Sequence, residues 1–118
     1  MIRTGQLYAS AGDYYTSQKI LRSAIQAYPE EYIATIYLAG ILIEEGIDVD
    51  EGVTMLEELE PECSWCSSSL LFSDYLGWGY FLQGRREDSV ELLQKSWDES
   101  PFAVLKRQRR LEEAKGSG

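Results

Sequence analysis

The chain repeats part of its own sequence at a spacing of 72 residues. Residues near the start recur in the same order further along, six of them identically and one as a similar small residue: Gly5 and Gly77, Tyr8 and Tyr80, Gly12 and Gly84, Ser17 and Ser89, Leu21 and Leu93, Ala24 and Ser96, Pro29 and Pro101. Because this spacing equals two periods of about 34 plus four, it predicts a middle copy. Ala39, Leu42 and Gly46 lie where that copy requires them. Repetition of this kind is typical of an array whose units bury their apolar faces by stacking.

The internal spacing of each copy indicates two helices. Gly5 and Tyr8 are three residues apart, so they share one face of a first helix, where the glycine lets a neighbouring helix approach. A second helix follows with an apolar stripe that includes Leu21 and Ala24. The expected breaks are a left-handed glycine between the helices and a proline after them, at Gly12, Gly46, Gly84, Pro29 and Pro101.

The middle copy departs from the pattern in its second half. One extra residue within 47–50 shifts the register, and the proline expected at Ser64 is found earlier, at Pro61. We therefore expect the second helix of this copy to end early and a longer loop to follow it.

These units resemble the tetratricopeptide repeat family. The third copy carries the family pattern best, with Leu76, Gly77, Tyr80, Gly84, Leu93 and Pro101, and with Ser89 and Ser96 in place of alanine. The resemblance implies an all-α, right-handed stack of three helix-turn-helix pairs followed by a C-terminal capping helix. It places a single domain at residues 1–115, with units at about 1–31, 32–66 and 67–101, a capping helix at about 102–115, and a flexible tail at 116–118.

The resemblance also implies a concave groove lined by the first helix of each unit. The groove residues expected here are Gln6, Tyr37, Gly40, Glu44, Asp74, Tyr75 and Trp78, and the same mapping includes Ile36 and Ile43. The Lys, Asn and Arg side chains with which some family members hold a terminal carboxylate are missing from these positions. Aromatic anchors beside Glu44 and Asp74 instead suit an apolar or amphipathic segment with a basic residue. Aromatic residues at helical spacing are also typical of a core, and that reading of Tyr75 and Trp78 remains open.

Charge is distributed unevenly along a chain whose net charge is −9. Residues 24–83 contain twelve acidic residues and neither Lys nor Arg. A solvated, soluble surface explains this pattern, and a negative field that attracts a basic partner also explains it. Nucleic acid is not expected as a partner, because its phosphates would be repelled.

The C-terminal segment is apolar at first and then basic. Helical spacing places Phe102 and Leu105 on one side, and Lys106 and Arg110 on another. We expect this helix to cap the array, with binding to RNA or a membrane surface as the alternative. A further alternative is a salt-sensitive homo-oligomer in which basic ends meet acidic middle units.

Cys63 and Cys66 form a Cys-x-x-Cys motif in the expected long loop. The first interpretation is two small, partly buried free thiols, followed by a reversible disulfide and then by zinc shared between two copies. Structural zinc needs four ligands, and the chain has no histidine and no further cysteine. No bound metal is therefore expected.

Catalysis has little support in the sequence. Without histidine there is no ordinary Ser-His or Cys-His pair, and no Gly-rich phosphate loop is present, so neither enzymatic activity nor a cofactor is expected. The densest apolar run, residues 33–43, is too short to span a membrane, and the start lacks a signal-peptide pattern. These features predict a cytoplasmic protein-interaction scaffold that binds a protein or peptide, with a self-associating structural or chaperone-like subunit, of the small secretion-chaperone type, as the alternative.

Overall fold

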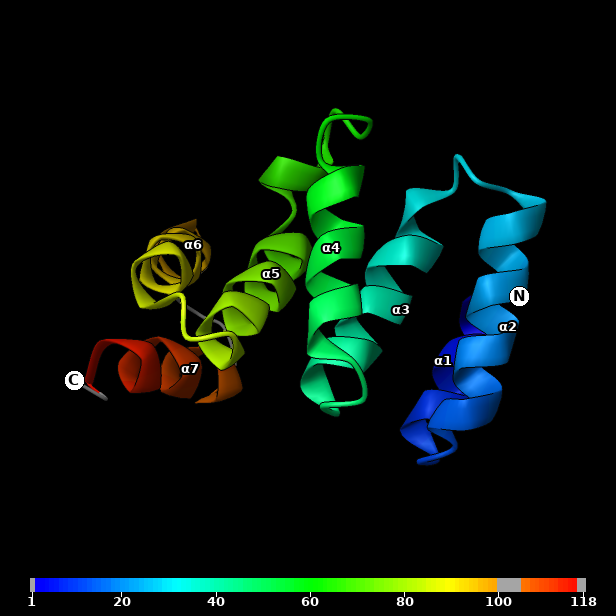
Figure 1. The fold of residues 1–118 in the computed structure, drawn as a ribbon, viewed down its shortest axis with the longest axis horizontal. Helices are drawn as coiled ribbons and strands as arrows, with labels where there is room; N and C mark the ends of the chain where they lie inside the picture. The colour runs from blue at the N-terminus through cyan, green and yellow to red at the C-terminus, as the bar shows by residue number, and fades with distance from the viewer. Residues whose placement is uncertain (1, 100–104, 117–118) are drawn as a thin grey trace.

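The computed structural model describes residues 2–99 and 105–116 (Figure 1). Within these ranges the chain forms α-helices and one short 3-10 helix, and no strand. The elements are α1 (Ile2–Ser10), α2 (Tyr14–Ala27), α3 (Tyr32–Glu44), α4 (Val49–Leu59), η1 (Cys66–Ser68), α5 (Leu70–Leu82), α6 (Arg86–Glu99) and α7 (Leu105–Gly116).

The helices form successive pairs from one end of the molecule to the other (Figure 1). In each pair the two helices pack together, α1 on α2, α3 on α4 and α5 on α6. Helix α3 also contacts α1 on one side and α5 on the other, so the first helices of the pairs form a continuous layer. The all-α class and the helix-turn-helix packing expected from the sequence are confirmed.

The repeated glycines lie at the crossing of the two helices of a pair. A Cβ atom on Gly5 would lie 3.0 Å from the side chain of Leu21, and one on Gly77 would lie 3.0 Å from Leu93. The hydroxyl of Ser17 donates a 2.7 Å hydrogen bond to the backbone oxygen of Gly5. The close approach predicted from the spacing is therefore present in both copies.

Local signals in the sequence place the helix ends. The turn glycines Gly12, Gly46 and Gly84 have φ angles of 85°, 64° and 82°, the left-handed conformation expected for them. The side chain of Asp13 accepts a hydrogen bond from the backbone of Thr16 at the start of α2. Asp48 caps α4 and Ser69 caps α5 in the same way.

The second helix of the middle pair ends early, at Leu59, as Pro61 predicts. A loop containing η1 then leads to α5. In this loop Cys63 and Cys66 are joined by a disulfide, and both are buried. The first interpretation of free thiols is thus wrong for this structure, and the second one, a disulfide, is correct. The cause is the tight turn at residues 63–66, in which the backbone N–H of Cys66 donates a 3.3 Å hydrogen bond to the backbone oxygen of Cys63 and the two sulfur atoms come together.

Helix α3 lies at the centre of the stack, and most of its residues are buried. Its Ile36 and Ile43 are 2 % and 0 % exposed and belong to the main core with Val53 and Phe72. Their expected place on the groove surface is wrong, because α4 and α5 pack against that side of α3.

Helix α7 packs against α6 and extends through Gly116, one residue past the expected end of the capping helix. Its Leu111 and Ala114 cover Leu93 of α6. The guanidinium of Arg86 donates a 2.8 Å hydrogen bond to the backbone oxygen of Ala114. The expectations for Pro101 and Phe102 lie outside the described residues.

Candidate functional site

Helices α3 and α5 place most of the expected groove residues together. Tyr37, Gly40 and Glu44 lie three and four residues apart on α3, and therefore on one face of it. Tyr75 and Trp78 have the same relation on α5. Because α3 and α5 are in contact, the two sets of side chains face a common surface.

Tyr75 fills the space above Gly40. An ideal Cβ atom on Gly40 would lie only 2.4 Å from Cε2 of the Tyr75 ring, so no other residue fits there without movement. Burial of the phenol, together with the nearby negative charge of Glu44, raises the pKa of Tyr75 to about 12. Tyr75 is thus a neutral, half-buried aromatic residue near Glu44 and Tyr37.

Trp78 is held between two neighbours. Its ring stacks on Phe81, with ring centroids 4.8 Å apart and planes 19° apart. The guanidinium carbon of Arg110, on α7, lies 4.9 Å from the centroid of the Trp78 ring, within the range of a cation–π interaction. Trp78 is therefore in contact with an aromatic ring of its own helix and with a cation of α7.

Arg110 joins α7 to this surface. Its Nη1 donates a 2.8 Å hydrogen bond to Oε1 of Glu44, and the two side chains are only 11 % and 19 % exposed. An ion pair this sheltered interacts more strongly than a surface pair. The sequence interpretation placed Arg110 only on the basic side of a capping helix and missed its contact with Glu44 and Trp78. One feature of the sequence indicated such a contact. Residues 24–83 contain no Lys or Arg, so a cation that pairs with a groove carboxylate has to lie outside this range.

Asp74 faces a different neighbour. It is 8 % exposed, and its Oδ1 accepts a 2.8 Å hydrogen bond from the hydroxyl of Ser96 on α6. This contact joins α5 to α6 from within the stack. The first copy has Ala24 where the third has Ser96. This replacement of an apolar residue by one with a hydroxyl was the feature of the sequence that could have indicated a polar contact here.

Gln6 lies on α1 and is half-buried. Helix α1 contacts α3, which extends the layer of first helices beyond the cluster of Tyr37, Tyr75 and Trp78. In the part of the chain that the structure describes, no side-chain hydrogen bond joins Gln6 to that cluster.

The described residues provide no metal site. No group of three or more His, Cys, Asp or Glu residues within residues 2–99 and 105–116 is placed to hold an ion. Among the same residues, no helix is both long and apolar enough to cross a bilayer. What the arrangement offers is aromatic surface, a carboxylate and a cation on adjoining helices.

Comparison with known families supports the resemblance. The family model of the tetratricopeptide repeat matches residues 1–31, which contain the α1–α2 pair. No curated protein matches the chain. A tetratricopeptide repeat is typical of modules that mediate protein–protein interactions.

Proposed function

We propose that the chain is a non-catalytic protein–protein interaction module that binds an apolar or amphipathic polypeptide segment along α3 and α5. The observation that carries this proposal is the cluster of Tyr37, Tyr75 and Trp78 beside Glu44 on two adjoining helices. Large, partly exposed aromatic side chains next to a sheltered charge are typical of the residues that dominate binding energy at interfaces.

The contact of Arg110 supports a basic residue in the bound segment. Glu44 and Trp78 already accommodate a guanidinium in this structure, through an ion pair on one side and a ring face on the other. A partner's arginine would fit the same two groups and compete with Arg110 for them. Asp74, which is engaged with Ser96, has a supporting role in this proposal, and Gln6 extends the surface onto α1.

The proposed module is one cytoplasmic domain of residues 1–115, with units at about 1–31, 32–66 and 67–101. Nucleic acid is not the proposed partner, because residues 24–83 offer acids and no cations to phosphate. Self-association as a structural or chaperone-like subunit is the competing function, and a molecular mass that rises with concentration would favour it.

Selection from a peptide-display library tests the proposal. Wild-type protein is expected to select segments with an apolar or aromatic residue near an Arg or Lys. Addition of the selected peptide should then shift the nuclear magnetic resonance (NMR) signals of the Trp78 indole and of the Tyr37 and Tyr75 rings. Selected peptides that instead shift only residues of α2 or α6 would contradict the proposal.

A further inference from the structure

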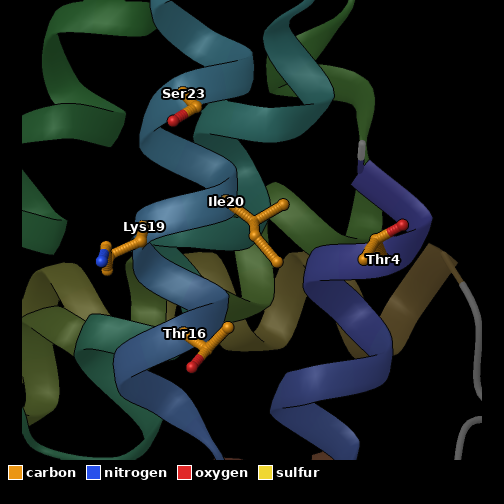
Figure 2. Close-up of a pocket in the computed structure, with 5 residues that line it drawn as sticks. All are labelled: Thr4, Thr16, Lys19, Ile20 and Ser23. Carbon is orange, nitrogen blue, oxygen red and sulfur yellow. The ribbon is translucent and has the colours of Figure 1, made fainter.

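The outer face of the α1–α2 pair carries an open pocket of about 520 Å³. It is lined by Thr4 on α1 and by Thr16, Lys19, Ile20 and Ser23 on α2 (Figure 2). Figure 2 shows Ile20 projecting from α2 toward α1, with Thr4 on the opposite side. The pair lies at one end of the stack, so this pocket is distinct from the surface of α3 and α5 (Figure 1).

Two exposed residues lie beside this pocket, and one of them, Tyr8, has buried equivalents in both other copies. Leu7 and Tyr8 on α1 are 65 % and 41 % exposed. The equivalents of Tyr8 are Leu42, at a spacing of 34 residues, and Tyr80, at 72 residues, and they are 1 % and 9 % exposed. The same sequence position is thus covered in two copies and open in one.

In both of those copies the cover is the second helix of the preceding pair. Helix α2 covers α3, where Leu21 packs with Leu38 and Leu42. Helix α4 covers α5, where a Cβ atom on Gly79 would lie 2.5 Å from Val53, and where the hydroxyl of Tyr80 donates a 2.8 Å hydrogen bond to Glu57. Because α2 covers α3 and α4 covers α5 in this way, we expect the same face of α1 to accommodate one amphipathic helix.

Charge narrows the chemistry of that helix. Lys19 is exposed and lines the pocket, and its Nζ lies 5.4 Å from the centroid of the Tyr15 ring. Helix α4, which covers the equivalent face of α5, places the carboxylate of Glu57 against the hydroxyl of Tyr80, and the equivalent of Tyr80 on α1 is Tyr8. Carboxylates on a covering helix would complement Lys19 and accept a hydrogen bond from Tyr8, whereas a second copy of this face would oppose like charges.

We propose that the outer face of α1 and α2 binds one amphipathic, acidic helix of a partner protein, packed as α4 packs on α5.

The shape of this face restricts which residues the partner helix can carry. Val53 of α4 rests on Gly79, but the equivalent residue in the first copy is Leu7. The partner helix therefore needs a small residue where α4 has Val53. This inference is independent of the function proposed for α3 and α5.

A titration of the full chain with one defined helix tests this inference. The probe is a synthetic peptide with the sequence of residues 48–60, in which Val53 is replaced by Ala and a hydrocarbon staple joins positions 54 and 58 to hold the helix. We expect saturable one-to-one binding with NMR shifts at the methyl groups of Leu7 and Ile20. Leu7→Glu should weaken binding at least tenfold.

Matched variants separate the outcomes. Leu82→Glu changes an exposed leucine on α5 and should leave peptide affinity within twofold of wild type, as should Trp78→Ala. Loss of binding in Trp78→Ala would show that the peptide binds the α3–α5 surface, and it would overturn the inference. The inference would also be overturned by the absence of shifts at millimolar peptide, by equal affinity in Leu7→Glu, or by dimerisation of the chain through Leu7.

Discussion

The ring of Tyr75 occupies the space that a side chain on Gly40 would need. Cε2 of the ring lies 2.4 Å from the ideal position of a Cβ atom on Gly40, and the ring carbon Cζ lies 2.5 Å from it. The glycine on α3 therefore fixes where the aromatic residue on α5 lies. The proposed binding surface depends on this contact, because it holds Tyr75 near Glu44.

Gly40→Ala should destabilise the fold by about 2 kcal/mol, because Tyr75 has to move out of a packed position. Urea unfolding followed by circular dichroism measures this free energy of unfolding. The control is the same change in a Tyr75→Ala background, where the clash is absent and the added methyl group should cost little or be favourable. An equal cost in both backgrounds would show that the ring does not cause the effect.

Arg110→Ala should also destabilise the fold by about 2 kcal/mol, since Glu44 would keep a sheltered charge without this partner. Arg110→Lys should recover part of the loss, because an ammonium can pair with Glu44 but lacks the planar contact with Trp78. The same Ala variant should bind a selected basic peptide more tightly than wild type does, by isothermal titration calorimetry. Weaker peptide binding by a fully folded Arg110→Ala protein would argue against competition.

Reduction of the Cys63–Cys66 disulfide should lower the free energy of unfolding by about 2 kcal/mol. This is the entropic contribution expected when a very short loop of the unfolded chain is no longer closed. Thermal unfolding with and without a phosphine reductant measures the effect. A Cys63→Ala, Cys66→Ala protein serves as the control, because reductant should not change its melting temperature. Unchanged melting of the wild type, with thiol titration confirming reduction, would assign the bond no stabilising role. Cytosolic thiols are generally kept reduced, so the thiol content of protein from its source cell also tests the proposed cytoplasmic location.

Stability should fall at high pH. Burial raises the pKa of Tyr75 and of Tyr80 to about 12, above the ordinary value of 10.0 for tyrosine. A raised folded-state pKa contributes stability that is fully present below about pH 10 and is lost as the pH rises through about 12. Urea unfolding between pH 9 and pH 12 should show this loss. Tyr75→Phe should reduce it, whereas Tyr15→Phe, at an exposed ring, should not.

Local sequence signals predicted much of the fold. Gly5 and Gly77 predicted the helix crossings, Gly12, Gly46 and Gly84 predicted the left-handed turns, and all of these features are present. Such features depend on spacing and on the conformational freedom of single residues, which are readable from the chain itself. The early end of α4 followed in the same way from a misplaced proline.

Long-range contacts were not readable in this way. Arg110 pairs with Glu44, which is 66 residues away in the sequence, and no local pattern at either position predicts this contact. Asp74 resembled a surface acid until α6 placed Ser96 against it. A Cys-x-x-Cys spacing suits thiols, a disulfide or half a metal site equally, and only the path of the loop decides among them.

The affinity of a display-selected peptide for matched aromatic variants tests the central claim most directly. Trp78→Ala and Tyr37→Ala each remove an aromatic side chain from the proposed surface, and Tyr15→Ala removes one from an exposed position on α2. With folding of each variant verified by circular dichroism, we predict at least tenfold weaker binding for the first two and unchanged binding for Tyr15→Ala. Equal affinity of all three variants and the wild type would contradict a binding surface on α3 and α5.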